Sequence, residues 1–220
     1  MKTLIIVAHP QLATSATQQF LQASAAPLTN VTWHALPAHL DLAAEQALLF
    51  GADRIVLQFP LYWYAAPAAL KAWLDTVWQA HLVDAARGGR LRGKQLGLVV
   101  SLGQPAAAFQ LGGAVGVSLS TLLAPYAALA RRTGMTLLPP LPIAQFSYQT
   151  ELAHQRLLIR YQQYLTAASQ HFTDRQAWWQ ARLAQATPEQ PALAEYVANQ
   201  AEEYERLQDT LRELKAEDDG

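Results

Sequence analysis

Short apolar runs alternate with helical segments along most of this chain, and this alternation limits the possible folds more than any other feature. Helical spacing or capping signals appear at Ser15–Ala25, Asp41–Leu49, from Pro67, at Ser118–Thr133 and at Glu151–Phe172. Between them lie segments typical of buried strands: Thr3–Val7, Val31–Leu36, Arg54–Phe59, Gln95–Ser101, and a fifth strand supplied by Thr136–Leu138 and Ile143–Phe146. Strands separated by helices predict βαβ units and a parallel sheet.

Five such strands favour an α/β fold with helices on both faces of the sheet and strand order 2-1-3-4-5. In sheets of this kind a ligand binds beyond the carboxyl ends of the strands, where the strand order reverses between strands one and three. The segments that follow strands one, three and four are therefore the candidate binding loops, and they are His9–Thr17, Pro60–Ala66 and Ser101–Gly113.

The first candidate loop leads into a helix N-terminus, where free backbone N–H groups and the positive end of the helix dipole suit a phosphate. Thr14, Ser15 and Thr17 add hydroxyl groups, and His9 can donate from its ring. The loop has neither the G-x-G-x-x-G pattern of dinucleotide-binding folds nor the G-x-x-x-x-G-K-[ST] pattern of nucleotide triphosphatases. From these residues alone, a helix cap with a structural histidine is an equally good interpretation.

The second candidate loop holds three consecutive aromatic residues, Tyr62–Tyr64, between Pro60 and Pro67. Adjacent side chains in a strand or helix point in different directions, so three adjacent aromatic rings cannot all face a core. A flat ring system could stack on them while backbone groups serve its polar edge. The alternative is an aromatic cluster that covers the end of the sheet.

The third candidate loop begins Ser101-Leu102-Gly103-Gln104. Gly103 permits close approach of a ligand to the backbone. Because glycine after a strand is common, this loop adds little by itself.

Composition excludes several other kinds of site. The chain has 220 residues and no cysteine, so disulfides, thiol catalysis and thiolate metal sites are ruled out. The histidines form no H-x-x-x-H pair, so no metal site is expected, and no G-x-S-x-G indicates a serine hydrolase. The first apolar run, Thr3–Val7, is too short for a signal peptide or membrane span, so we expect a cytoplasmic protein.

The charges are segregated along the chain. Residues 195–220 carry nine acidic and three basic side chains, whereas residues 1–194 carry eight acidic and thirteen basic ones. A mildly basic body suits an anionic ligand such as a phosphorylated cofactor, and its charge is too dispersed to indicate nucleic acid. An acidic, solvated helix attached to an ordinary domain explains the same distribution.

The end of the chain shows a different pattern. A helix is predicted at Asp174–Ala186, a break at Thr187–Glu189, and a final helix at about Pro191–Lys215. Apolar residues in the last segment recur at steps of three and four with one polar position, which is a heptad seam. We therefore expect a domain at residues 1–172 and a helical extension at 173–220 that packs its seam on that domain or across a dimer.

Taken together, the loop sequences resemble a known family. The motif A-H-P…S in the first loop, Q-F-P-L-Y-W-Y-x-x-P-x-x-L-K-x-W-L-D at Gln58–Asp75 and S-L-G-Q at Ser101–Gln104 are similar to those of the flavodoxin-like NAD(P)H:quinone oxidoreductases. Within that family the sequence is most similar to the bacterial branch that includes the ancillary flavoproteins of glutathione-regulated potassium efflux systems. The resemblance covers roughly residues 1–170.

The resemblance implies a non-covalent flavin, FMN or alternatively FAD, and a homodimer with each flavin near the subunit interface. It further implies ping-pong turnover, in which NAD(P)H reduces the flavin and a quinone-type acceptor reoxidises it. The cofactor-binding residues that it implies are His9, Ser15, Ala16, Thr17 and Gln18 for the phosphate, Pro60, Leu61, Tyr62, Trp63 and Tyr64 for the ring, and Ser101, Leu102, Gly103 and Gln104 on its other side.

Two positions depart from the family pattern. Animal members carry a tyrosine and a histidine in the third loop that assist hydride transfer, and the matching substrate-pocket positions here are Phe109 and Val115. Neither side chain can move a proton, which leaves Tyr62, Tyr64 and Gln104 as candidate donors near the flavin. The weakened third loop also motivates an alternative function, a regulatory flavoprotein that docks on a membrane cation-efflux system. The sequence leaves open the physiological acceptor and the choice between NADH and NADPH.

Overall fold

The structure is a computed structural model that describes residues 1–185, 199, 203, 206–207 and 209–210. The chain divides into a first unit, residues 1–170, and a second unit, residues 171–220. In the second unit, α8 (Phe172–Gln185) covers most of the helix predicted at Asp174–Ala186. The final helix predicted at Pro191–Lys215 lies mostly outside the described residues, so its seam stays a prediction.

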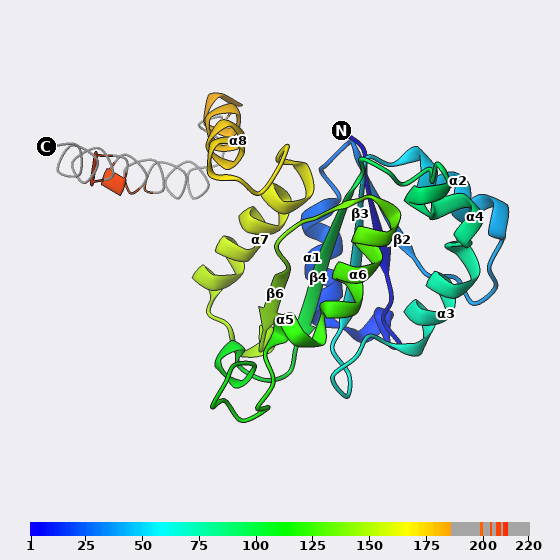
Figure 1. The fold of residues 1–220 in the computed structure, drawn as a ribbon. Helices are drawn as coiled ribbons and strands as arrows, with labels where there is room; N and C mark the ends of the chain where they lie inside the picture. The colour runs from blue at the N-terminus through cyan, green and yellow to red at the C-terminus, as the bar shows by residue number, and fades with distance from the viewer. Residues whose placement is uncertain (186–198, 200–202, 204–205, 208, 211–220) are drawn as a thin grey trace, which may run out of the picture. The chain divides into compact units, whose positions relative to one another are not determined.

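A parallel sheet forms the centre of the first unit (Figure 1). Its strands are β1 (Thr3–Val7), β2 (Val31–Ala35), β3 (Arg54–Pro60), β4 (Gln95–Leu102), β5 (Thr136–Leu137) and β6 (Leu141–Ala144). The strand order is β2-β1-β3-β4-β5, and Ile5 of β1 lies between Trp33 of β2 and Val56 of β3. The predicted order 2-1-3-4-5 is therefore confirmed.

The fifth position in the sheet is filled by two short strands. Both β5 and β6 pair in parallel with β4, and Pro139 and Pro140 lie between them. Proline has no N–H to donate to a neighbouring strand, which explains the interruption. The second piece was predicted at Ile143–Phe146, but it begins and ends two residues earlier.

Helices cover both faces of the sheet. α1 (Ala16–Ala25) and α7 (Glu151–Thr166) bury their apolar side chains against one face, and α2 (Leu42–Gly51), α3 (Ala68–Val77) and α6 (Ala124–Thr133) against the other. The remaining elements are short: α4 (Ala80–Val83), α5 (Leu119–Leu122) and the 3-10 turns η1 (Leu12–Thr14), η2 (Ala85–Arg87), η3 (Ala106–Ala108) and η4 (Phe146–Tyr148). Among the described residues, no helix has the length and apolar character needed to span a membrane.

Three helices differ from their predicted extents, and α2, predicted at Asp41–Leu49, differs least, since it ends two residues later at Gly51. The helix predicted at Ser118–Thr133 is broken at Leu123 and resumes with Pro125 in its first turn, because proline cannot donate to a preceding helical turn. The helix predicted to reach Phe172 ends at Thr166. At that end, the guanidinium of Arg54 donates to the carbonyl of Tyr164 in the last turn and, at 2.5 Å, to that of Ala167 just after it.

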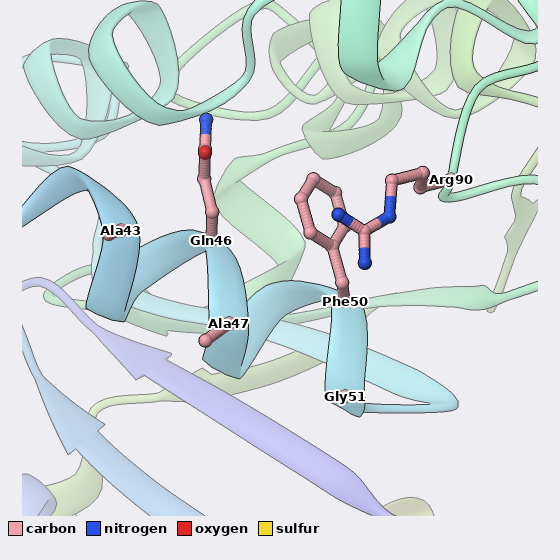
Figure 2. A pocket seen from close by; sticks show the side chains of 6 residues that line it. All are labelled: Ala43, Gln46, Ala47, Phe50, Gly51 and Arg90. Carbon is pink, nitrogen blue, oxygen red and sulfur yellow. The ribbon is translucent and has the colours of Figure 1, made fainter.

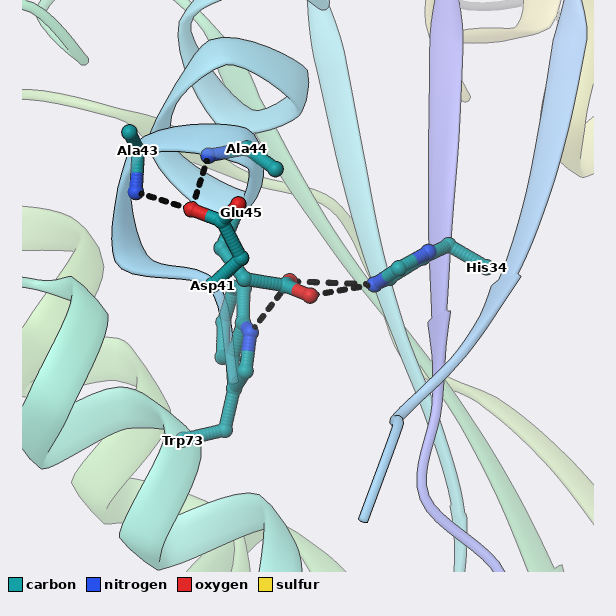
Figure 3. Close-up of polar contacts among 6 residues, drawn as sticks. All are labelled: His34, Asp41, Ala43, Ala44, Glu45 and Trp73. Carbon is teal, nitrogen blue, oxygen red and sulfur yellow. Dashed lines mark hydrogen bonds and ion pairs between the residues drawn. The ribbon is translucent and has the colours of Figure 1, made fainter. Parts of the chain in front are cut away.

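A buried carboxylate ties α2 and α3 to the sheet (Figure 3). Glu45 of α2 is only 3% exposed, and its oxygens lie 2.9 and 3.0 Å from Nε2 of His34 on β2. Trp73 of α3 donates its indole N–H to the same carboxylate at 2.8 Å. A buried charge is tolerated only when such partners satisfy it, so this cluster specifies how α3 lies against α2.

Candidate functional site at the carboxyl edge of the sheet

The structure brings the three predicted loops together at the carboxyl ends of β1, β3 and β4. The amide of Ala8 donates to the carbonyl of Gln58 at 2.9 Å, which holds the first loop beside the second. The amide of Leu61 donates to the carbonyl of Ser101 at 2.9 Å, which holds the second loop beside the third. The His9 and Tyr62 rings meet edge to face, with centroids 6.2 Å apart. The three candidate loops therefore lie side by side at one edge of the sheet, next to the point where the strand order reverses.

The N-terminus of α1 offers donors at this site. Ser15 caps the helix, and its Oγ accepts the amide of Gln18 at 3.3 Å. The amides of Ala16 and Thr17 stand in the first turn, where a helix has no acceptor of its own, and no other described residue accepts from them. Two free N–H groups at the positive end of a ten-residue helix suit an anion.

His9 supplies a further donor next to this turn. The amide of Gln11 donates to Nδ1 of His9 at 3.1 Å, so the neutral ring carries its proton on Nε2. Partial burial lowers the pKa of His9 below its usual value of 6.5. The ring is therefore neutral at pH 7 and can donate from Nε2.

Gln18 has a different place from the other residues predicted for the phosphate. Its side chain is buried, and its Oε1 accepts a hydrogen bond from the side-chain Nε2 of Gln58 at 2.6 Å. The hydroxyl of Tyr161 on α7 donates to Oε1 of Gln58 at 2.7 Å, and burial raises the pKa of Tyr161 well above 10. This buried chain of hydrogen bonds joins α1, β3 and α7, and it holds the start of α1 in place.

Sequence reasoning missed the roles of Gln58 and Tyr161. The signal for Gln58 is present in the sequence, because it is a neutral polar residue inside the fully buried strand Arg54–Pro60. A buried amide requires hydrogen-bond partners, so its presence predicts an internal network. Tyr161 carries no such signal, because a tyrosine on the apolar face of a helix is ordinary.

The aromatic segment of the second loop forms a tight two-residue turn. Tyr62 and Ala65 exchange both backbone hydrogen bonds, at 2.9 and 3.1 Å. Trp63 and Tyr64 between them have φ of 47° and 66°, a left-handed conformation that non-glycine residues rarely adopt. Two bulky residues in this conformation store strain, which is concentrated at functional sites in proteins.

The turn also presents its rings to solvent. Tyr62 is 47% exposed, Tyr64 52% and Trp63 94%. The rings therefore do not cover the end of the sheet as a core cluster would. The alternative interpretation of this loop, a buried aromatic cluster, does not describe the structure.

The third loop contributes unevenly to the site. Gly103 and Gln104 are exposed and Ser101 is half-buried, whereas the Leu102 side chain lies in the core. The two substrate-pocket positions predicted from the resemblance, Phe109 and Val115, pack into the hydrophobic cluster on the α3 side of the sheet, and Phe109 is 8% exposed. Among the described residues, no three His, Asp or Glu side chains are grouped so that they could hold a metal ion.

Comparison with known proteins agrees with this geometry. A family model described as a flavodoxin-like fold matches residues 1–165. The chain belongs to this flavodoxin-like family. The resemblance read from the loop motifs is thereby confirmed, and the match covers all of the site.

Individual members of the flavodoxin-like family are also similar to this chain. The uncharacterized NAD(P)H oxidoreductase YrkL of Bacillus subtilis is 38% identical over 144 residues, which are 63% of this chain and 83% of YrkL. The crystal structure of an NADPH-quinone reductase from P. pentosaceus is 50% identical with a TM-score of 0.73, and covers 76% of this chain and 98% of its own. The general stress protein 14 of Treponema denticola, solved in complex with FMN, is 35% identical with a TM-score of 0.68, and covers 75% of this chain and 98% of its own.

Proposed function

We propose that this protein is a flavin-dependent oxidoreductase that transfers hydride from NAD(P)H to a quinone-type acceptor, with FMN bound at the carboxyl edge of the sheet. The observation that carries the proposal is the strained, exposed aromatic turn at Tyr62–Ala65, next to a helix N-terminus with free amides. The relative solved with FMN and the relative named an NADPH-quinone reductase support the same cofactor and reaction class.

The residues present fit the phosphate of FMN. Ala16 and Thr17 would donate their amides, and His9 would donate from Nε2 because Nδ1 is already occupied by Gln11. The phosphate would gain charge-assisted hydrogen bonds at a helix N-terminus, which are stronger than neutral ones. Gln18 would act indirectly, because its buried side chain holds the first turn of α1.

The residues present also fit the flavin ring. Tyr62, Trp63 and Tyr64 would form one wall, and Gly103 would permit close approach from the third loop. Bound FMN would supply the hydride chemistry itself, so the chain needs to supply only position, electrostatics and exclusion of water. This division of roles explains how Phe109 and Val115, which cannot move a proton, are compatible with turnover.

The reaction balances as NAD(P)H, a proton and a quinone giving NAD(P)⁺ and a hydroquinone. In a ping-pong cycle the nicotinamide and the quinone would occupy the same place in turn, above the aromatic turn. Tyr62, Tyr64 and Gln104 are exposed at this edge and would be the donors nearest the reacting groups. A homodimer in which a second subunit completes the pocket is part of the proposal.

Anaerobic titration of the purified protein tests the function. We expect a yellow protein that either NADH or NADPH bleaches without oxygen, and release of FMN on denaturation. With a water-soluble benzoquinone, double-reciprocal plots at several quinone concentrations should be parallel. A colourless protein that neither FMN nor FAD reconstitutes would contradict the proposal.

A pair of matched variants tests the location of the site. Ser15→Ala removes the cap of α1 and should weaken FMN binding, because the first-turn amides lose their fixed direction. Thr150→Ala removes the equivalent cap of α7, where the threonine accepts the amide of Ala153 at 3.2 Å. Each change should cost about 0.5–2 kcal/mol of stability. Only Ser15→Ala should also raise the dissociation constant for FMN; an equal effect of both variants would place the phosphate elsewhere.

A further inference from the structure

The basic excess of the first unit is concentrated away from the proposed flavin site. Residues 1–170 carry eleven Lys and Arg side chains and six Asp and Glu side chains. Six of the eleven cations lie in residues 87–94 and 131–132, and they are Arg87, Arg90, Arg92, Lys94, Arg131 and Arg132. The first segment leads into the amino end of β4 and the second ends α6, so both lie at the edge of the sheet opposite the site.

These two segments are in contact and form one surface. The amide of Gly93 donates to the carbonyl of Gly134 at 2.9 Å. Arg132 and Arg87 both approach the same oxygen of Asp84, at 2.6 and 3.8 Å. Asp84 is buried and pairs with these two arginines, whereas no described carboxylate forms an ion pair with Arg90, Arg92 or Arg131. We call the exposed arginines at positions 87, 90, 92, 131 and 132 the arginine surface.

A pocket of about 520 Å³ opens beside Arg90 (Figure 2). Its lining residues come from one side of α2 and from the arginine surface, and they are Ala43, Gln46, Ala47, Phe50, Gly51 and Arg90. Small side chains leave the space open next to the Phe50 ring. The guanidinium carbon of Arg90 lies 3.8 Å from the centroid of that ring, and no described carboxylate forms an ion pair with Arg90.

We propose that the arginine surface and this pocket dock an acidic segment of a partner protein that carries an apolar side chain. The partner's carboxylates would pair with the arginines, whose planar forks bind carboxylates in a bidentate manner. Its apolar side chain would enter the pocket against Phe50 and Ala47. Exposed charge pairs contribute little affinity but speed association and select the partner, whereas a buried anchor side chain supplies most of the binding energy.

The same features argue against a lipid surface as the occupant. Peripheral membrane binding combines basic residues with apolar side chains that project into the bilayer. Among the described residues, the large exposed hydrophobic side chains include none from residues 84–94 or 124–137. Because the surface lies at the opposite edge of the sheet from the aromatic turn, docking would leave the flavin site open, and the inference does not depend on the proposed function.

Fluorescence anisotropy with defined peptides tests the proposal. The probes are labelled twelve-residue peptides, each of eleven Glu or Asp residues around one central Phe, and matched peptides with Ser in place of Phe. At 50 mM salt we expect the Phe peptides to bind more tightly, and we expect salt to weaken both. Arg90→Glu should weaken binding at least tenfold, whereas Arg156→Glu, an equal charge change at an exposed residue on α7, should change it less than twofold.

A second variant separates the pocket from the charges. Ala47→Leu fills the pocket at an exposed helix position, and it should abolish the advantage of the Phe peptides while leaving the Ser peptides unaffected. Circular dichroism confirms that each variant is folded. Equal effects of Arg90→Glu and Arg156→Glu, no peptide binding at 0.1 mM, or stronger binding to phosphatidylglycerol vesicles than to peptides would each overturn the proposal.

Discussion

The aromatic turn holds Tyr64 at a φ of 66°, and this strain can be measured. An L-residue in the left-handed region costs roughly 1–2 kcal/mol relative to its right-handed conformation. Glycine adopts this conformation freely, although its unfolded chain loses about 0.5–1 kcal/mol more entropy on folding. A glycine at position 64 should therefore be more stable than an alanine there by about 1 kcal/mol.

The comparison of Tyr64→Gly with Tyr64→Ala isolates the backbone, because both variants remove the same ring. For a domain of this size, about 1 kcal/mol corresponds to a difference of roughly 2–4 °C in Tm. Differential scanning calorimetry should be performed on flavin-free protein, because bound FMN adds its own stabilisation. In the same two variants, FMN should bind more weakly than in the original chain, since the ring that forms one wall is gone.

The two readouts test different parts of the reasoning. An alanine variant as stable as the glycine variant would show that the left-handed conformation carries no strain. Unchanged FMN affinity in both variants would show that the Tyr64 ring does not contact the cofactor.

Three further predictions concern buried and half-buried groups. Glu45→Ala should lower the free energy of unfolding by about 1–3 kcal/mol in urea titrations. The main cause is that the indole of Trp73, which is 1% exposed, loses its acceptor, whereas His34 can still reach water. Glu45→Gln keeps an acceptor and should lose less stability. Arg54→Met should lower the free energy of unfolding by about 3 kcal/mol, because it leaves several carbonyls at the end of α7 without donors. In the same titrations, Arg54→Lys should lower the free energy of unfolding less. The pKa of His9 is lowered in the folded state, so the neutral ring favours folding above pH 6.5 and this contribution is lost as the pH falls. An NMR titration should find the midpoint of His9 protonation below pH 6.5. Between pH 7.5 and 5.5, the Tm of the His9→Gln variant should fall less than that of the original chain.

Strand order and the meeting of the three candidate loops at one edge of the sheet follow from the sequence by local rules. Apolar runs such as Thr3–Val7 separated by helical segments specify a parallel sheet, and its topology places the ligand loops at one edge. The motif at Gln58–Asp75 then identifies the family. Both inferences depend on residues that are close in sequence, which is why they needed no structure.

Element boundaries depended on contacts distant in sequence. α7 ends at Thr166, where Arg54, more than a hundred residues away in sequence, donates to carbonyls at the end of the helix. No spacing in the segment Glu151–Phe172 signals this end. The division of the fifth strand at Pro139 and Pro140 could have been read from the sequence, because proline cannot donate in a sheet.

What the sequence determined by itself is therefore the fold, the three loops and the aromatic character of one of them. What only the tertiary structure decided is how those loops are held. Trp63 and Tyr64 take left-handed backbone conformations because Tyr62 and Ala65 close a two-residue turn. That conformation opposes the local preference of both residues, and the loop that contains it is held by a contact distant in sequence, from the amide of Leu61 to the carbonyl of Ser101.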